Sequence, residues 1–254
     1  MSPRRLTKWV LRVAAIPLAV YLVLVVVVYS QQRAMLFFPT HHASSNGPLT
    51  PWLEGKRTIG FCRETPNAHT VWLMTHGNAG QAADRDYVLS RMSDQDSLYV
   101  VEYPGYGKRD GSPCRESMNQ AASDAYHLLR SHNRNIPVCV IGESIGSGPA
   151  CALAGEKIPP DKIVLAVPFD SLASVASERF WFLPVRLMLR DPWNNMEALK
   201  LYTGPVDIFG ARGDAIIPVK HAKALASQVT GAHFTEIEGG HNEWSESTQV
   251  RITR

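Results

Sequence analysis

The chain has 254 residues, 45% hydrophobic and 19% charged, which suits one globular domain with an appendage. Its formal charge is +3, but Arg4, Arg5, Lys8 and Arg12 precede the first acidic residue. Removing those four from the 26 basic residues leaves 22 against 23 acidic ones. The folded part is therefore close to neutral, which argues against a nucleic-acid partner. The sequence shows no internal repeat and no low-complexity segment, so a solenoid is also excluded.

A long apolar segment lies near the N-terminus. Residues 13–29 read VAAIPLAVYLVLVVVVY without a charge and approach the roughly 20 apolar residues that cross a bilayer. Basic residues lie before it, which predicts a cytoplasmic N-terminus and a catalytic domain on the opposite, periplasmic or extracytoplasmic side. We therefore predict a single-pass membrane anchor over residues 1–30. A secretory signal cleaved after Ser30 is the alternative.

Strand and helix patterns alternate along the rest of the chain. Residues 31–55 read as a tether that becomes the first strands. Apolar patterns predict strands at 69–75, 97–102, 137–141, 162–167, 206–210 and 234–237, and helices near 81–92, 117–130 and 147–155. This alternation predicts an α/β fold over residues 31–254, with a mostly parallel sheet and helices on both faces. Functional groups are expected where the strands end.

A serine lies in a glycine-flanked turn between a predicted strand and a predicted helix. The sequence Gly142-Glu143-Ser144-Ile145-Gly146 follows the apolar strand at 137–141 and precedes a run of small residues. G-x-S-x-G in this context is typical of a nucleophile elbow. A purely structural glycine-rich turn is the alternative, but the flanking elements favour Ser144 as a nucleophile.

A reactive serine needs a histidine to accept its proton and a carboxylate to orient that histidine. Asp214 follows the strand at 206–210, and His241 follows the last strand, which gives the chain order serine, acid, histidine. We predict these two residues as acid and base. Asp170 and Asp207 are the rival acids, although Asp207 lies inside a strand pattern, which favours a place at the surface or in a loop. His221 and His233 are interpreted as surface residues.

Acyl transfer also needs hydrogen-bond donors for the negative oxygen of the intermediate. The backbone N–H of Ile145, directly after the predicted nucleophile, is one candidate. The small-residue loop at 76–80, HGNAG, offers a second at Asn78. A plain turn at the end of the strand is the alternative interpretation of that loop.

Together these motifs resemble the Bem46-like group of α/β-hydrolases, relatives of ABHD13 and ABHD17 type serine hydrolases. The resemblance rests on the apolar N-terminal segment, QQRAMLFFP, HGNAG, YPGYG at 103–107, the serine elbow, the acid at 214 and the histidine at 241. It covers about residues 30–243. It implies an α/β-hydrolase fold and hydrolysis of ester or thioester bonds, often lipid-linked, by Ser144, Asp214 and His241. Glu143 departs from the pattern, because a basic or amide residue is common there.

Residues 171–200 are richer in large apolar side chains than a plain crossover needs. We interpret this segment as a lid, with Trp181 and Phe182 as substrate-binding residues, and a helix merely packed on the sheet as the alternative. A serine peptidase or a catalytically silent binding protein are the competing functions. No motif for a cofactor or metal is present in the sequence. The cysteines are too scattered for a disulfide scaffold, although a Cys62–Cys114 bridge is permitted in an extracytoplasmic domain.

Overall fold

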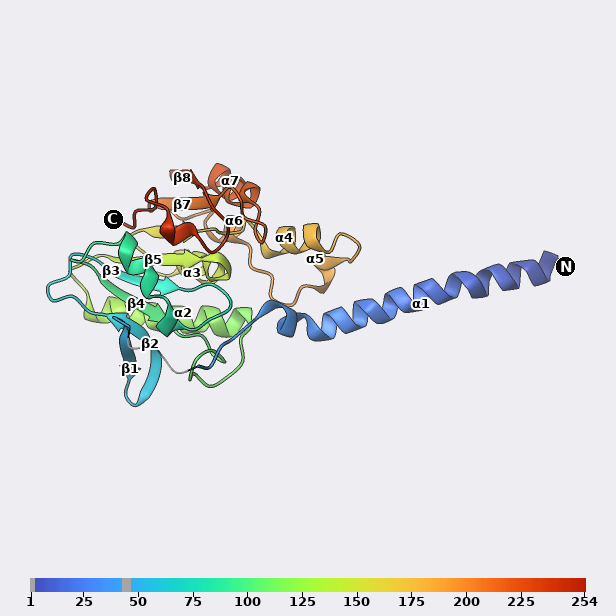
Figure 1. Ribbon diagram of the computed structural model, residues 1–254, viewed down its shortest axis with the longest axis horizontal. Helices are drawn as coiled ribbons and strands as arrows, with labels where there is room; N and C mark the ends of the chain where they lie inside the picture. The colour runs from blue at the N-terminus through green and yellow to red at the C-terminus, as the bar shows by residue number, and fades with distance from the viewer. Residues whose placement is uncertain (1–2, 43–46) are drawn as a thin grey trace.

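An eight-stranded sheet forms the centre of the molecule (Figure 1). The computed structural model describes residues 3–42 and 47–254, with side chains from Ala15 onward. In chain order the strands are β1 (Thr50–Glu54), β2 (Arg57–Arg63), β3 (Val71–Thr75), β4 (Ser97–Val101), β5 (Val138–Glu143), β6 (Ile163–Ala166), β7 (Val206–Ala211) and β8 (Ala232–Ile237). Their spatial order is β1-β2-β4-β3-β5-β6-β7-β8. β2 pairs antiparallel with both of its neighbours, β1 and β4, and all the other pairs, from β4-β3 to β7-β8, are parallel.

The central strands are buried on both faces, which explains why the sequence reads there as continuous apolar runs. Successive side chains on a strand point to opposite faces. On β3, Leu73 belongs to one hydrophobic cluster and Trp72 to the other, and on β5 Val140 and Ile141 divide in the same way. The sheet therefore separates two cores, as the predicted α/β fold requires.

Different kinds of helix cover the two faces. The α-helices α2 (Arg115–His132), α3 (Ser147–Ala152, continued by the 3-10 turn η4, Leu153–Gly155) and α7 (Val219–Gln228) contribute to one core. The 3-10 turns η1 (Ala82–Asp84), η2 (Asp86–Arg91) and η5 (Trp244–Glu246) cover the other face, with the C-terminal residues Val250 and Ile252. The predicted mostly parallel sheet with helices on both faces is confirmed.

The helix predicted near residues 81–92 forms two 3-10 turns instead of one α-helix. The Asp84 carboxylate accepts a hydrogen bond from Gln81 N–H, which closes the first turn on itself. The Arg85 side chain turns back to the carbonyls of Gly77 and Ala79. These local and tertiary polar contacts compete with a continuous α-helix.

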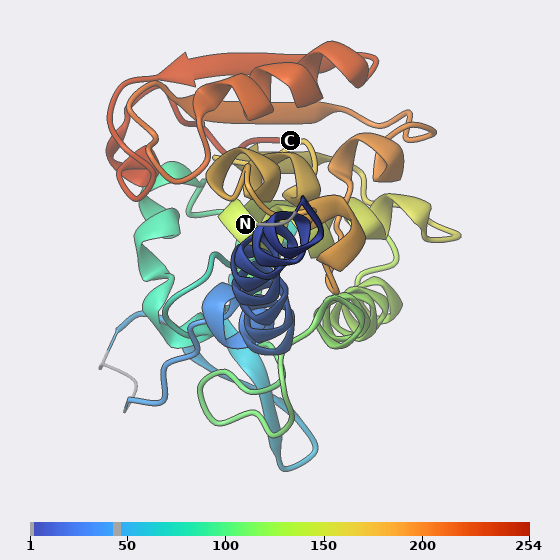
Figure 2. The ribbon, with the colours of Figure 1, turned by 90° about the vertical axis from the view of Figure 1, so that its right-hand side faces the viewer.

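Three short helices follow β6, where the lid was predicted. They are α4 (Leu172–Arg179), α5 (Val185–Met188) and α6 (Asn195–Ala198). Ser171 caps α4 by accepting a hydrogen bond from Ser174 N–H, and Asn194 caps α6 in the same way through Glu197 N–H. The segment between α4 and α6 lies beside the first helix of the chain, as the end-on view in Figure 2 shows.

The first helix, α1 (Pro3–Leu36), has 34 residues and projects from the body of the molecule (Figure 1). Its part from Ala15 to Leu36 is long and apolar enough to cross a membrane, and it is the one such stretch among the described residues. The helix continues past Ser30, where the predicted anchor ended, so residues 31–36 are helical and not part of a loose tether. The three polar residues Gln31, Gln32 and Arg33 follow the uncharged run but are good helix formers, so the helix continues through them.

Candidate active site

Ser144 lies in a sharp turn between β5 and α3, in the short 3-10 element η3 (Ser144–Gly146). Its backbone has φ of +51°, a left-handed conformation that costs energy in a residue with a side chain. The turn is so close to β3 that a Cβ on Gly146 would collide with the carbonyl oxygen of Thr75. This close approach explains why the elbow needs glycine at position 146.

The structure brings Ser144, His241 and Asp214 into one hydrogen-bonded chain. The His241 Nε2 atom lies 2.8 Å from Ser144 Oγ, and its Nδ1 atom lies 2.6 Å from Asp214 Oδ2. Ser144 and Asp214 are both buried, and the His241 side chain is only 10% exposed. This arrangement can remove a proton from the serine hydroxyl and hold the resulting imidazolium.

Backbone hydrogen bonds fix the loops that carry Asp214 and His241. The second carboxylate oxygen of Asp214 accepts hydrogen bonds from Ile216 N–H and Ile217 N–H, both at 2.8 Å. The two loops are tied directly, because Gly213 N–H donates to Gly239 O at 2.9 Å. Since β7 and β8 are parallel neighbours, both loops leave the sheet at the same edge as Ser144.

The HGNAG loop lies against the elbow, and both Asn78 and Ile145 line the cavity in front of Ser144. The Asn78 side chain is already engaged: its Oδ1 accepts from Phe38 N–H and Tyr106 O–H, and its Nδ2 donates to Leu36 O. The Asn78 side chain therefore fixes the end of α1 and the segment that follows it. Only the Asn78 backbone N–H is left as the oxyanion donor that the sequence predicts.

A buried carboxylate beside the nucleophile fixes this loop. Glu143 Oε2 accepts from Gly77 N–H at 2.7 Å, and Glu143 Oε1 accepts from Tyr87 O–H and Trp244 Nε1–H. Arg85 lies 3.9 Å from Glu143 and donates to the carbonyls of the same loop. Burial alone would raise the pKa of the Glu143 carboxyl, but the Arg85 charge and these hydrogen bonds lower it overall.

Only part of this network is predictable from the sequence. An acidic residue at position 143 was recognised as unusual, but its partners Arg85, Tyr87 and Trp244 come from distant segments of the chain. No spacing rule connects them, because the contact arises only when η2 and η5 pack on the same face of the sheet. The sequence therefore marks Glu143 as unusual but does not predict that its carboxylate fixes the HGNAG loop.

A cavity of 680 Å³ opens in front of Ser144. This lies in the range of pockets that bind small molecules. Most of its surface is apolar. Its lid side is formed by α1, the residue Phe38 beyond it, and the segment around α4, through Met35, Leu36, Phe38, Leu172, Val175, Ala176 and Phe180. Neither Trp181 nor Phe182 lines it, and their role as substrate-binding residues stays a prediction. Trp181 is 81% exposed, whereas the neighbouring Phe180 lines the cavity.

The rival residues are placed elsewhere. Asp170 lies 2.9 Å from His221 Nδ1, so this acid has a different histidine as partner. His221 was expected at the surface but is only 3% exposed, because α7 turns it inward onto that carboxylate. His233 is exposed, as predicted. Cys62 and Cys114 are free thiols, so the permitted bridge between them is not formed.

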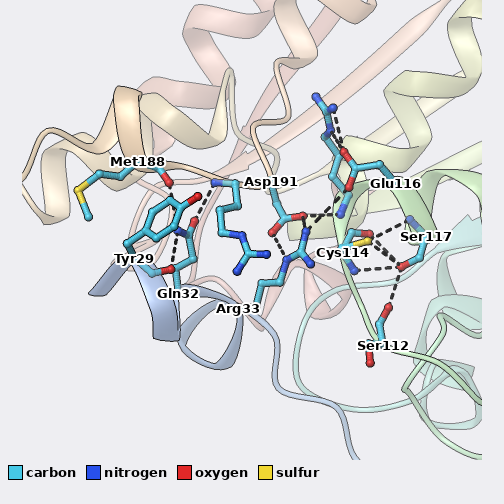
Figure 3. A network of polar contacts seen from close by, with 11 residues as sticks. Tyr29, Gln32, Arg33, Ser112, Cys114, Glu116, Ser117, Met188 and Asp191 are labelled. Atoms are coloured by element: carbon cyan, nitrogen blue, oxygen red, sulfur yellow. Dashed lines mark hydrogen bonds and ion pairs between the residues drawn. The ribbon is translucent and has the colours of Figure 1, made fainter. Parts of the chain in front are cut away.

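The end of α1 is fixed to the body of the molecule by a polar network (Figure 3). Arg33 donates two hydrogen bonds to the buried Asp191 carboxylate, at 2.9 and 3.1 Å. Gln32 donates to Met188 O and accepts from Arg190 N–H. Cys114, Glu116 and Asp191 come within 4.8 Å of one another, and the Arg33 guanidinium supplies the positive charge at this cluster.

Known proteins resemble the chain in sequence and in fold. No protein-family model matches it. An uncharacterized protein of Mycobacterium tuberculosis is 28% identical over 232 residues, covering 85% of this chain and 82% of that protein. The lysophosphatidylserine lipase ABHD12 of Danio rerio is 26% identical over 200 residues, covering 70% of this chain and 52% of the lipase. The chain thus spans about half the length of that relative.

Among solved structures, the Pyrococcus furiosus esterase Pf2001 superposes with a TM-score of 0.63 at 13% sequence identity. The match covers 82% of this chain and 95% of the esterase. At this identity the likeness shows the fold. The chain has the α/β-hydrolase fold. The relatives support the α/β-hydrolase superfamily, whereas the Bem46-like group stays a prediction.

Proposed function

We propose that the protein is a membrane-anchored serine hydrolase that cleaves carboxylic ester or thioester bonds. The observation that carries the proposal is the hydrogen-bonded chain from Ser144 through His241 to Asp214 at the wall of an apolar cavity. The esterase fold and the similarity to a lysophosphatidylserine lipase support ester chemistry, and they make lysophospholipids candidate substrates.

The proposed reaction has two halves. Ser144 Oγ attacks the ester carbonyl while His241 takes the hydroxyl proton, and the backbone N–H groups of Ile145 and Asn78 bind the negative oxygen. Collapse of the intermediate breaks the ester bond, and His241 gives its proton to the leaving alcohol or thiol. Water then attacks the acyl-enzyme by the same route and releases a carboxylic acid. Asp214 stabilises the charged imidazole in both halves.

The domain boundaries are part of the proposal. Residues 1–30 would form most of the membrane anchor, with a cytoplasmic N-terminus, and residues 31–254 the catalytic domain on the opposite side. The segment 171–200 would act as a lid, which agrees with the contribution of α4 to the cavity wall. Its apolar tip at Trp181 and Phe182 would contact lipid and not the reacting ester.

Labelling with a fluorophosphonate, which reacts with activated serines, tests the nucleophile. The detergent-solubilised full chain should be labelled, and Ser144→Ala should abolish both labelling and turnover of p-nitrophenyl esters. Ser227→Ala, an exposed serine on α7, is the matched control and should behave as the wild type. A folded wild-type protein that is neither labelled nor able to turn over an ester would favour a silent binding protein instead.

A further inference from the structure

A second cavity of 140 Å³ lies between α1 and the lid helices α4 and α5. Its lining is almost wholly apolar. Val28 and Gln32 of α1 form one side, and Leu183, Val185, Met188 and Leu189 form the other. Five residues, Met35, Leu36, Leu172, Ala176 and Phe180, line this cavity and the Ser144 cavity alike. The two cavities therefore lie side by side and share these apolar walls, and the route through both, from the side of α1 to Ser144, is called the passage below.

The outer end of this passage lies where the uncharged part of α1 ends. Val28, which lines the smaller cavity, directly precedes Tyr29, the last residue of the uncharged apolar run at 13–29. The Arg190 guanidinium lies 5.8 Å from the centre of the Tyr29 ring. Tyrosine and arginine gather at the level of lipid head groups, where each keeps its polar end in water. With α1 across a bilayer, the passage opens at the boundary between head groups and acyl chains.

The tip of the lid reaches further along α1. Tyr21 O–H donates to Phe182 O at 3.0 Å, and Tyr21 precedes Tyr29 by about 12 Å along a helix. The apolar side chains of Trp181 and Leu187 at this tip are 81% and 89% exposed in the isolated molecule. Placed beside a membrane-spanning helix, they would be surrounded by acyl chains instead of water.

The mouth of the passage is held in a fixed arrangement. Arg33 and Gln32 bind α1 to the chain around α5 through the Asp191 carboxylate, Met188 O and Arg190 N–H (Figure 3). Both walls are thus held together from the protein side. An apolar passage with one wall on a transmembrane helix has lipid chains as its nearest apolar ligand.

We propose that a membrane lipid ester with one long acyl chain, the candidate substrate named above, reaches Ser144 laterally from the bilayer, entering between α1 and α4–α5. The ester rises to Ser144, the head group lies in the larger cavity, and the acyl chain trails through the smaller one. The smaller cavity, 140 Å³ against 680 Å³, favours a single chain over two. This inference rests on the proposed hydrolase function, and the products are the same: water supplies the oxygen of the released fatty acid.

Blocking the passage outside the Ser144 cavity tests the route. Val28→Trp fills the outer mouth, whereas Val26→Trp places the same bulk on the other side of α1, where Val26 is 64% exposed. The full chain is reconstituted in phosphatidylcholine vesicles that carry a palmitoyl monoester of glycerol. For Val28→Trp, turnover of this ester should fall at least tenfold relative to turnover of soluble p-nitrophenyl butyrate. Val26→Trp should keep the wild-type ratio.

An unchanged ratio in Val28→Trp would overturn the route and leave the hydrolase proposal standing. A wild type that turns over neither ester would instead overturn the hydrolase proposal. A second measurement does not depend on folding of the tryptophan variant. In Ser144→Ala, a vesicle-borne palmitoyl ester with a diazirine on its acyl chain should cross-link to residues 28–36 and 172–189. Cross-links confined to other parts of the chain would exclude this passage.

Discussion

The two sides of the Ser144 cavity are built from opposite chemistry. On the elbow side, buried polar groups such as Glu143, Arg85 and Asp214 fix backbone loops through hydrogen bonds from several strands. On the lid side, the wall is mostly apolar side chains from α1 and α4, with Arg179 as the charged exception, and large apolar side chains on the outer surface are exposed. Reacting atoms need fixed positions, whereas an acyl chain needs only apolar volume. The contrast separates residues that set rate from residues that set substrate access.

The largest effect is expected on the elbow side, at Asp214. Asp214→Asn keeps the side-chain shape but removes the charge that stabilises protonated His241, so kcat for p-nitrophenyl esters should fall about 10⁴-fold. Asp207→Asn is the matched control and should lose little activity, because Asp207 lies within β7, the strand before Asp214, and pairs with Lys162. Comparable kcat values for the two variants would refute the role proposed for Asp214.

Loss of the Glu143 carboxylate should lower the free energy of unfolding of the protein. Glu143→Gln leaves the buried Arg85 guanidinium without its charge partner, at a cost of about 3 kcal/mol in the free energy of unfolding. Denaturant unfolding in detergent measures this. Glu156→Gln, which affects a half-buried ion pair with His127, should cost less than about 1 kcal/mol.

The stability lost in Glu143→Gln should depend on pH. The pKa of Glu143 is lowered below its ordinary 4.5 in the folded protein, so its stabilisation is present above pH 4.5. It is lost as the pH falls through the lowered pKa. The stability difference between wild type and Glu143→Gln should therefore be largest near neutral pH and shrink in acid. A difference that grows toward low pH would contradict the assignment.

A smaller effect is expected where the two sides meet, at the attachment of α1. Arg33→Gln removes a charge-assisted pair from the buried Asp191 carboxylate and should cost about 1.5 kcal/mol. Limited proteolysis between α1 and β1 should accelerate, because the helix is held less firmly. Arg134→Gln, an exposed arginine after α2, is the control. Equal proteolysis rates in both variants would mean that the pair does not hold α1.

The smallest effect is expected at the tip of the lid. Trp181→Ala removes apolar surface outside the cavity, so turnover of soluble short esters should stay unchanged. Turnover of vesicle-borne long-chain esters should fall about threefold, since lipid contact is weakened and not lost. Leu201→Ala removes a similarly exposed apolar side chain outside the lid. An equal loss in both variants would show that the tip has no special contact with lipid.

The elbow side was also the more predictable from sequence. Its residues follow strands whose apolar patterns are strong, so Ser144, Asp214 and His241 could be assigned by position and the structure brings them within hydrogen-bonding distance. The strands themselves lie within about two residues of the expected ranges. Parallel pairing explains this success, because it places the ends of neighbouring strands at one edge.

The lid side was less predictable because its contacts depend on how separate elements pack. The number of large apolar residues in 171–200 indicates that this segment is more than a plain crossover. It does not predict that Phe180 lines the cavity while Trp181 is exposed. The continuation of α1 to Leu36 was not predicted, for a related reason. The predicted anchor stops where the uncharged apolar run stops, whereas the helix continues through Arg33, which binds the buried Asp191 carboxylate in a distant part of the chain.

The left-handed backbone at Ser144 has a consequence for how such a protein can evolve. Glycine would adopt that φ without penalty, so the hydroxyl is kept at the expense of roughly 1 kcal/mol of folding free energy. Ala79 and Val167 share the same backbone region at the same sheet edge. Heat tolerance in this lineage must therefore be gained elsewhere, in the cores and helix caps, because the edge that carries reactivity cannot be relaxed without losing it.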